Sequence, residues 1–219
     1  MNENQIKQNK LDYSDIEITL KLLYQALYFE PTSLLLSEIE DSGILLYLQN
    51  KLNIRLSLQN KLINLNNDID NIQLDHLSLF VGLGMPLAPP WGSIYLNEEN
   101  LLLRESTYQW MDFLEQQHFQ FNLTEQQPYD HIGLMISVIS TLWYKLKDDN
   151  LNIDFYYHSI RTILSQYLLP WSERFCHLVI ENSQTYFYKY IGNLLYQTLN
   201  ELKVIFNIDD IEKSYFIKI

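Results

Sequence analysis

The chain has 219 residues, with 15 Lys and Arg against 27 Asp and Glu, giving a formal net charge of −12. Hydrophobic residues make up 47% of the sequence, which excludes wholesale disorder and is typical of a globular protein. The acidic excess argues against a nucleic-acid binder, because such proteins neutralise phosphates with clustered Lys and Arg. The composition therefore favours cationic or apolar partners.

The length fits one domain over residues 1–219. Cys176 is the single cysteine and has no partner for an internal disulfide, which fits a reducing compartment. The first residues are polar and do not resemble an export signal, and no apolar run reaches the roughly 18 residues of a membrane span. We expect a soluble, cytoplasmic protein without stable membrane insertion.

The N-terminal third carries helix signals separated by Pro31 and Gly43. Ser14 and Glu17 form a capping box ahead of an apolar helical pattern that Pro31 ends. A second short helix should stop near Gly43, and residues 44–67 are interpreted as one or two helices. The Asn-rich residues 64–71 favour a loop or a helix start.

The middle of the chain is predicted to hold two helices around a Pro-rich loop. Leu74, Leu77, Phe80 and Val81 are spaced for one helical face, and the helix should end near Gly82. After the loop, residues 106–119 return to helical spacing.

Four further helices are predicted between Pro128 and Phe206. Pro128 occupies a position typical of the first residue of a helix, and residues 132–146 are apolar nearly all round, which places that helix at the centre of a bundle. Further helices are predicted over 154–168, 172–182 and 184–206. With no βαβ alternation and no phosphate loop, the fold class is all-α, a single globular bundle of around ten helices with a Pro-rich loop.

The histidines give no metal-binding pattern. None of His76, His118, His131, His158 and His177 pairs with another at the i, i+4 spacing of a helical zinc site. Cys176 and His177 are neighbours, and side chains of helical neighbours point about 100° apart. We therefore expect no metal, no cofactor and no catalytic residue.

Asp130 followed by His131 is the most enzyme-like element, because a carboxylate beside an imidazole can tune it for proton transfer. No nucleophile or oxyanion motif completes an active site. The alternative interpretation is structural: Asp130 complements a helix dipole after Pro128, and His131 hydrogen-bonds a loop. Contact with a ligand or peptide is a third interpretation.

The segment 79–96 is unusual for its three Gly and three Pro residues, which fix an irregular path. Met85, Trp91 and Tyr95 are large apolar groups carried by this segment. A rigid Pro-Pro-Trp turn can wedge an aromatic side chain into a helical core. It can equally wall one side of a groove for an apolar peptide.

Several separated blocks resemble the TorD/DmsD family of redox-enzyme maturation chaperones, with the DmsD branch the most similar. They are Leu-Phe-x-Gly at 79–82, Pro-Pro-Trp-Gly-Ser-x-Tyr-Leu at 89–96, Glu-Ser-Thr at 105–107, Gln-Pro-Tyr-Asp-His-Ile-Gly at 127–133 and Leu-Pro-Trp-Ser-x-Arg-Phe at 169–175. They follow the family order and spacing over residues 75–200.

The resemblance implies an all-α cytoplasmic chaperone, not an enzyme. Such a protein binds the twin-arginine signal peptide of a molybdopterin reductase, typically the dimethyl sulfoxide reductase catalytic subunit, until the cofactor is inserted. The resemblance also implies components of the Tat translocase as candidate partners. We expect a monomer, with a domain-swapped dimer as the alternative state.

Matching the family motifs residue by residue implies a set of signal-peptide-binding positions. They are Leu79, Pro90, Trp91, Tyr95, Gln127, Pro128, Asp130 and His131. Three positions depart from the family pattern: Gln127 stands where an acid is usual, Arg104 where Gly is frequent, and Tyr167 where His is usual.

A twin-arginine signal joins two guanidinium groups to an apolar stretch, so its binder needs carboxylates beside an apolar groove. We hypothesise that Asp130 meets the arginines, that Trp91, Tyr95 and Leu79 contact the apolar part, and that His131 orients Asp130 or binds peptide backbone. Two rival functions are a chaperone that recognises the body of a client without a twin-arginine signal, and an Asp/His hydrolase.

Overall fold

The computed structural model describes residues 13–51, 65–123, 126–149, 151–211 and 215–217. Its helices in chain order are α2 (Tyr13–Tyr28), α3 (Ser33–Ser42), α4 (Ile44–Lys51), the 3₁₀ turn η1 (Leu65–Asp68), α5 (Ile69–His76), the π-helical turn η2 (Leu77–Val81), α6 (Gly92–Leu96) and α7 (Glu105–Gln116). They continue with α8 (Ile132–Asp148), α9 (Ile153–Thr162), the π-helical segment η3 (Ile163–Leu168), α10 (Leu169–Asn182) and α11 (Tyr186–Ile205). The described residues contain no strand, which confirms the all-α prediction.

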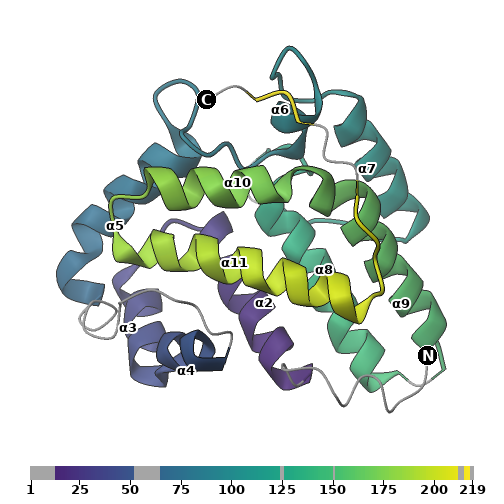
Figure 1. Cartoon of the computed structure of the whole chain (residues 1–219), viewed down its shortest axis with the longest axis horizontal. Coiled ribbons are helices and arrows are strands. Elements are labelled where there is room, and N and C mark those ends of the chain that lie inside the picture. Colours follow the sequence, from purple (N-terminus) through teal and green to yellow (C-terminus); the bar gives the residue numbers. More distant parts are fainter. Residues whose placement is uncertain (1–12, 52–64, 124–125, 150, 212–214, 218–219) are drawn as a thin grey trace.

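Two helix pairs form the centre of the molecule. In Figure 1, α10 and α11 run side by side across the front, and α2 and α8 lie behind them. The N-terminal half of α8 is buried almost all round, as its apolar sequence predicts. The hydrophobic core extends from α2 to Ile217. Close to that end, the Phe216 N–H donates to the Tyr95 carbonyl at 2.8 Å, tying this part of the chain to α6.

Most predicted helix ends agree with the structure to within a few residues. The αL conformation of Gly43 ends α3, with its N–H donating to the Glu40 carbonyl at 3.1 Å. Residues 44–51 form α4, whereas 52–64 lie outside the described residues. The predicted break between 168 and 172 is absent, because Pro170 lies in the first turn of α10, where its missing N–H costs no helical bond.

The predicted start of α8 at Pro128 is wrong. The helix begins at Ile132 with His131 as its N-cap, and the Pro128 carbonyl accepts the His131 N–H at 3.3 Å in a turn before the helix. Asp130 therefore does not lie in the first turn of α8. The imidazole of His131 caps the helix, which begins four residues after the predicted first position at Pro128.

The helical face predicted from Leu74, Leu77, Phe80 and Val81 does not pack into the core as a unit. Leu74, Leu77 and Val81 are 60%, 44% and 54% exposed, and of the four predicted residues only Phe80 is buried. The buried polar side chains are Asp75, which accepts the Thr185 N–H at 2.8 Å and hydroxyl at 2.6 Å, and His76, whose Nδ1 lies 2.8 Å from the Tyr188 hydroxyl. Hydrogen bonds to α11 thus rotate the apolar stripe toward solvent.

Candidate functional site

The two segments that carry most of the predicted site residues lie side by side. Trp91 and His131 form an isolated antiparallel bridge. The Ile132 N–H donates to the Pro90 carbonyl at 2.7 Å, and the Gly92 N–H donates to the Asp130 carbonyl at 3.1 Å. Pro90, Trp91, Asp130 and His131 are therefore brought together by backbone hydrogen bonds although some 40 residues separate them in sequence.

Asp130 supports this junction from inside. Its side chain is 1% exposed, and Oδ2 accepts the backbone N–H of Ser93 at 2.7 Å, within the first turn of α6. Among the described residues Oδ1 has no hydrogen-bond partner, and it too is buried. The carboxylate thus fixes the turn that carries Trp91, and a guanidinium could reach it only if the surrounding chain moved.

His131 is buried between two aromatic rings. Its centroid lies 5.2 Å from that of Tyr28 and 5.8 Å from that of Trp91, both in edge-to-face geometry. Burial, with a smaller contribution from the nearby His76, lowers the pKa of His131 to about 3. The ring is therefore neutral near pH 7, and its Nδ1 accepts the Gly133 N–H instead of bonding Asp130.

Trp91, Gln127 and Pro128 form a partly exposed lip over this junction, which we call the Trp91 lip. The Trp91 indole N–H donates to Gln127 Oε1 at 3.2 Å. At the position where the family usually carries an acid, this chain has a neutral acceptor that orients the tryptophan. The lip contains the predicted residues that a ligand can touch without rearrangement.

Leu79 and Tyr95 are completely buried. Tyr95 stacks on Trp171 with a centroid separation of 5.1 Å, and its hydroxyl donates to the Pro89 carbonyl at 2.9 Å. The Leu79 carbonyl accepts the Ala88 N–H at 2.8 Å. Both residues therefore hold the Pro-rich loop against the core. Tyr95, which follows the Pro-Pro-Trp turn, is an aromatic side chain inserted into the helical core.

The other two departures from the family pattern have structural partners. Tyr167 packs against Trp110 at a centroid separation of 5.2 Å, and its carbonyl accepts the Trp171 indole N–H at 2.7 Å. Arg104 is paired with Glu99 at the surface. Neither lies on the Trp91 lip.

An open groove of about 560 Å³ follows the C-terminal end of α2 and is not among the sites predicted from the sequence. It is lined by the side chains of Glu30, Asp70, Gln73, Leu74, His76, Leu77 and Val81. We call it the α2–α5 groove. The sequence signal that could have located this groove is the helical spacing of Leu74, Leu77 and Val81, which is also typical of a face packed into a core.

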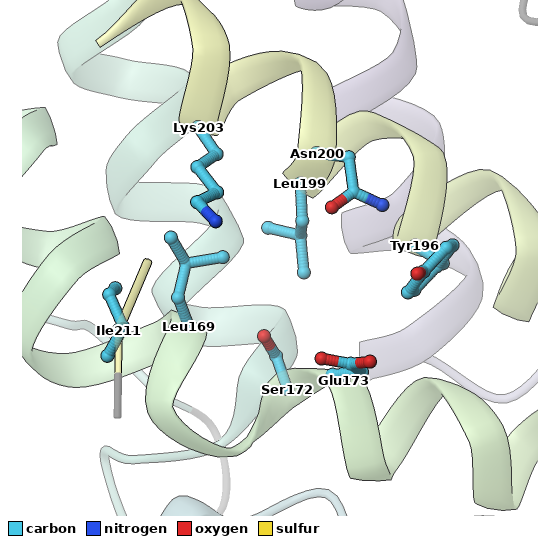
Figure 2. Close-up of a pocket in the computed structure, with 8 residues that line it drawn as sticks. All are labelled: Leu169, Ser172, Glu173, Tyr196, Leu199, Asn200, Lys203 and Ile211. Atoms are coloured by element: carbon cyan, nitrogen blue, oxygen red, sulfur yellow. The ribbon is translucent and has the colours of Figure 1, made fainter. Parts of the chain in front are cut away.

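A separate, small cavity lies between α10 and α11. Figure 2 shows its lining residues, which come from α10, α11 and Ile211, and its volume is about 50 Å³. None of the predicted site residues lies there.

The described residues contain no group of three or more His, Cys, Asp or Glu side chains placed to hold a metal ion. In the same residues, no helix has both the length and the apolar character needed to cross a bilayer.

Comparison with known proteins places these features in a family. The family model described as nitrate reductase delta subunit matches residues 48–177, which include the Trp91 lip and its supports. The chain belongs to this family. The resemblance to TorD/DmsD proteins seen in the sequence is thereby confirmed.

Individual relatives carry chaperone names. The chain is 30% identical over 121 residues to the Tat proofreading chaperone DmsD of Salmonella typhimurium, covering 55% of each protein. It is 30% identical over 141 residues to a protein named probable Tat proofreading chaperone DmsD from Haemophilus influenzae, covering 64% of each. It is 28% identical over 116 residues to the chaperone protein TorD of a Psychrobacter species. The matches thus span only about half to two thirds of the length of these relatives.

Proposed function

We propose that this protein is a redox-enzyme maturation chaperone that binds the twin-arginine signal peptide of a molybdopterin reductase precursor. The client would be of the dimethyl sulfoxide reductase type, held in the cytoplasm until its cofactor is inserted. Membership of the family and the names of the relatives support the chaperone role. The observation that carries the peptide-binding role is the Trp91 lip, an aromatic and proline surface within the family-matched segment.

The predicted site residues fall into three groups, those that contact the peptide, those that position the lip and those that support the loop. Trp91, Gln127 and Pro128 contact the peptide, because their side chains reach solvent. Asp130 and His131 are positioning residues: the first fixes the start of α6 and the second caps α8, so that together they hold the lip in place. Leu79, Pro90 and Tyr95 support the loop from within.

Calorimetric titration with a twin-arginine signal peptide tests this assignment. We expect the wild-type chain to bind the peptide and a Trp91→Ala variant to bind it at least roughly tenfold more weakly, as for a partly buried aromatic anchor. Tyr144→Ala is the matched control, since this exposed aromatic lies near the C-terminal end of α8, far along the helix from His131. Circular dichroism would establish that both variants remain folded.

The experiment also separates the rival chaperone function. A precursor lacking its signal peptide should not bind. If it binds as tightly as the full precursor while the isolated peptide does not bind, the client is recognised through its body and the proposal is wrong.

A further inference from the structure

The α2–α5 groove combines an exposed apolar stripe with two carboxylates. Leu74, Leu77 and Val81 follow one another at i, i+3 and i+7 along α5 and η2, and all three are exposed. Apolar residues at this spacing ordinarily face a core or a partner. Within the described part of the chain no element covers them.

The charges of the groove all have one sign. Glu30 and Asp70 are exposed, line the groove, and make no hydrogen bond or ion pair with another described residue. Among the described residues that line the groove there is no Lys or Arg, and burial lowers the pKa of His76 to about 4, which leaves its ring neutral near pH 7. The groove therefore carries two negative charges that no described lining residue neutralises, beside an apolar wall.

The groove adjoins the support of the Trp91 lip through the end of α2. Tyr28, the last residue of α2, packs edge-on against His131, and Glu30 follows two residues later. The Gln73 side-chain amide donates to the Pro31 carbonyl at 2.8 Å, which fixes this end of α2 against α5. The groove and the support of the Trp91 lip thus share the end of α2.

We propose that the α2–α5 groove, rather than Asp130, receives the arginine pair of the signal peptide. Glu30 and Asp70 pair with the guanidinium groups, and Leu74, Leu77 and Val81 contact the apolar side chains that flank the pair. The occupant follows from charge complementarity, because a dicationic apolar segment matches two carboxylates beside an apolar stripe. This inference rests on the proposed function and names the part of the site that selects the arginines.

A double-mutant comparison of protein and peptide tests the groove. The full-length chain and the variant Glu30→Gln/Asp70→Asn are titrated with a twin-arginine signal peptide and with the same peptide carrying Gln at both arginines. Asp112→Asn/Glu115→Gln is the control, since it removes the same charge from two exposed carboxylates on α7. All the substituted residues are exposed, so we expect the variants to fold, and thermal melts verify this.

We expect the groove variant to bind the twin-arginine peptide roughly three- to tenfold more weakly than wild type, the range for two solvent-exposed ion pairs. In that variant the change from Arg to Gln in the peptide should have little further effect. The control variant should stay within about twofold of wild type, which allows only for long-range charge.

Each contrary outcome has one meaning. If wild type binds neither peptide, the proposed function itself fails. If wild type prefers the twin-arginine peptide and the groove variant keeps that preference, or if the control loses as much affinity, only the groove assignment is overturned. A change of sedimentation coefficient in Leu74→Ser/Leu77→Ser would also overturn it, because the stripe would then be covered by a second copy of the chain.

Discussion

The imidazole Nδ1 of His131 accepts the backbone N–H of Gly133 at 3.0 Å. The bond caps the buried N-terminus of α8, and it requires an unprotonated Nδ1. The same ring lies edge-on to both Trp91 and Tyr28. One neutral side chain therefore connects the Trp91 lip, α2 and the central helix.

This arrangement predicts a loss of stability in mild acid. The pKa values of His131 and His76 are lowered to about 3 and about 4 in the folded protein, against about 6.5 when unfolded. Below pH 6.5 the unfolded chain therefore binds protons that the folded chain does not. The free energy of unfolding should fall as the pH drops from 6.5 toward 4, by up to about 1.4 kcal/mol per pH unit for each histidine. Urea unfolding across this range measures the slope.

Substitutions at His131 separate its role as the N-cap of α8 from its contribution to the pH dependence of stability. His131→Asn supplies another N-cap acceptor without a titrating group, so the acid-dependent slope should become shallower while the helix start is kept. His131→Ala should cost about 1 kcal/mol for the cap alone, and more for the space it leaves. His158→Gln, at an exposed histidine, should leave the slope unchanged. An unaltered slope in His131→Asn would contradict the assignment.

Gly92 is required by the close approach of α6 to Trp171. A Cβ atom at this position would lie 2.8 Å from the Trp171 indole nitrogen, and Trp171 is fully buried. Gly92→Ala should therefore destabilise the protein by about 1–3 kcal/mol. Gly84→Ala has open space around its Cβ and serves as the control, with little change in midpoint expected in thermal unfolding.

Asp75 links α5 to the start of α11. Its carboxylate accepts the Thr185 N–H, the Thr185 hydroxyl and the Gln184 N–H, the last at 3.1 Å. Asp75→Ala leaves the buried N–H and hydroxyl donors of Thr185 without this acceptor and should cost about 2–3 kcal/mol in denaturant unfolding. Glu38→Gln, an exposed acid on α3, should have no measurable effect. Equal stability of the two variants would show that the link is dispensable.

Cys176 should react with thiol reagents only after unfolding. The side chain is fully buried, and burial raises the pKa of its thiol well above the usual range. Labelling with a colourimetric disulfide reagent should be slow in buffer and complete in denaturant. Rapid labelling of the native protein would mean that α10 opens readily.

The sequence predicted helices well where local signals decide them. Gly43 predicts the end of α3, and the apolar run after residue 132 predicts α8. Both predictions succeed because capping and amphipathic patterning act within a few residues. The approach of residues 90–92 to 130–132 was not predictable from spacing, since it depends on backbone bonds between distant segments. Only the family resemblance placed these residues in one site.

Buried hydrogen bonds, and not the apolar pattern, decide which face of α5 packs against the core. Asp75 and His76 are buried because α11 offers them partners, and their burial turns Leu74 and Leu77 outward. The pattern of apolar residues around Asp75 contains no information about hydrogen-bond donors, such as the Thr185 N–H, that lie 110 residues away in sequence. The α2–α5 groove is the result, and hydrophobic patterning alone does not predict it.

Trp91 also provides an optical reporter of its own surroundings. Of the four tryptophans, Trp110, Trp143 and Trp171 are almost completely shielded, whereas Trp91 is partly open to solvent. Collisional quenchers such as iodide should therefore reach the emission of Trp91 alone in the native protein. A molecule bound over the lip would protect Trp91 from quenching. Fluorescence of the unlabelled wild-type chain therefore reports whether the candidate site is occupied.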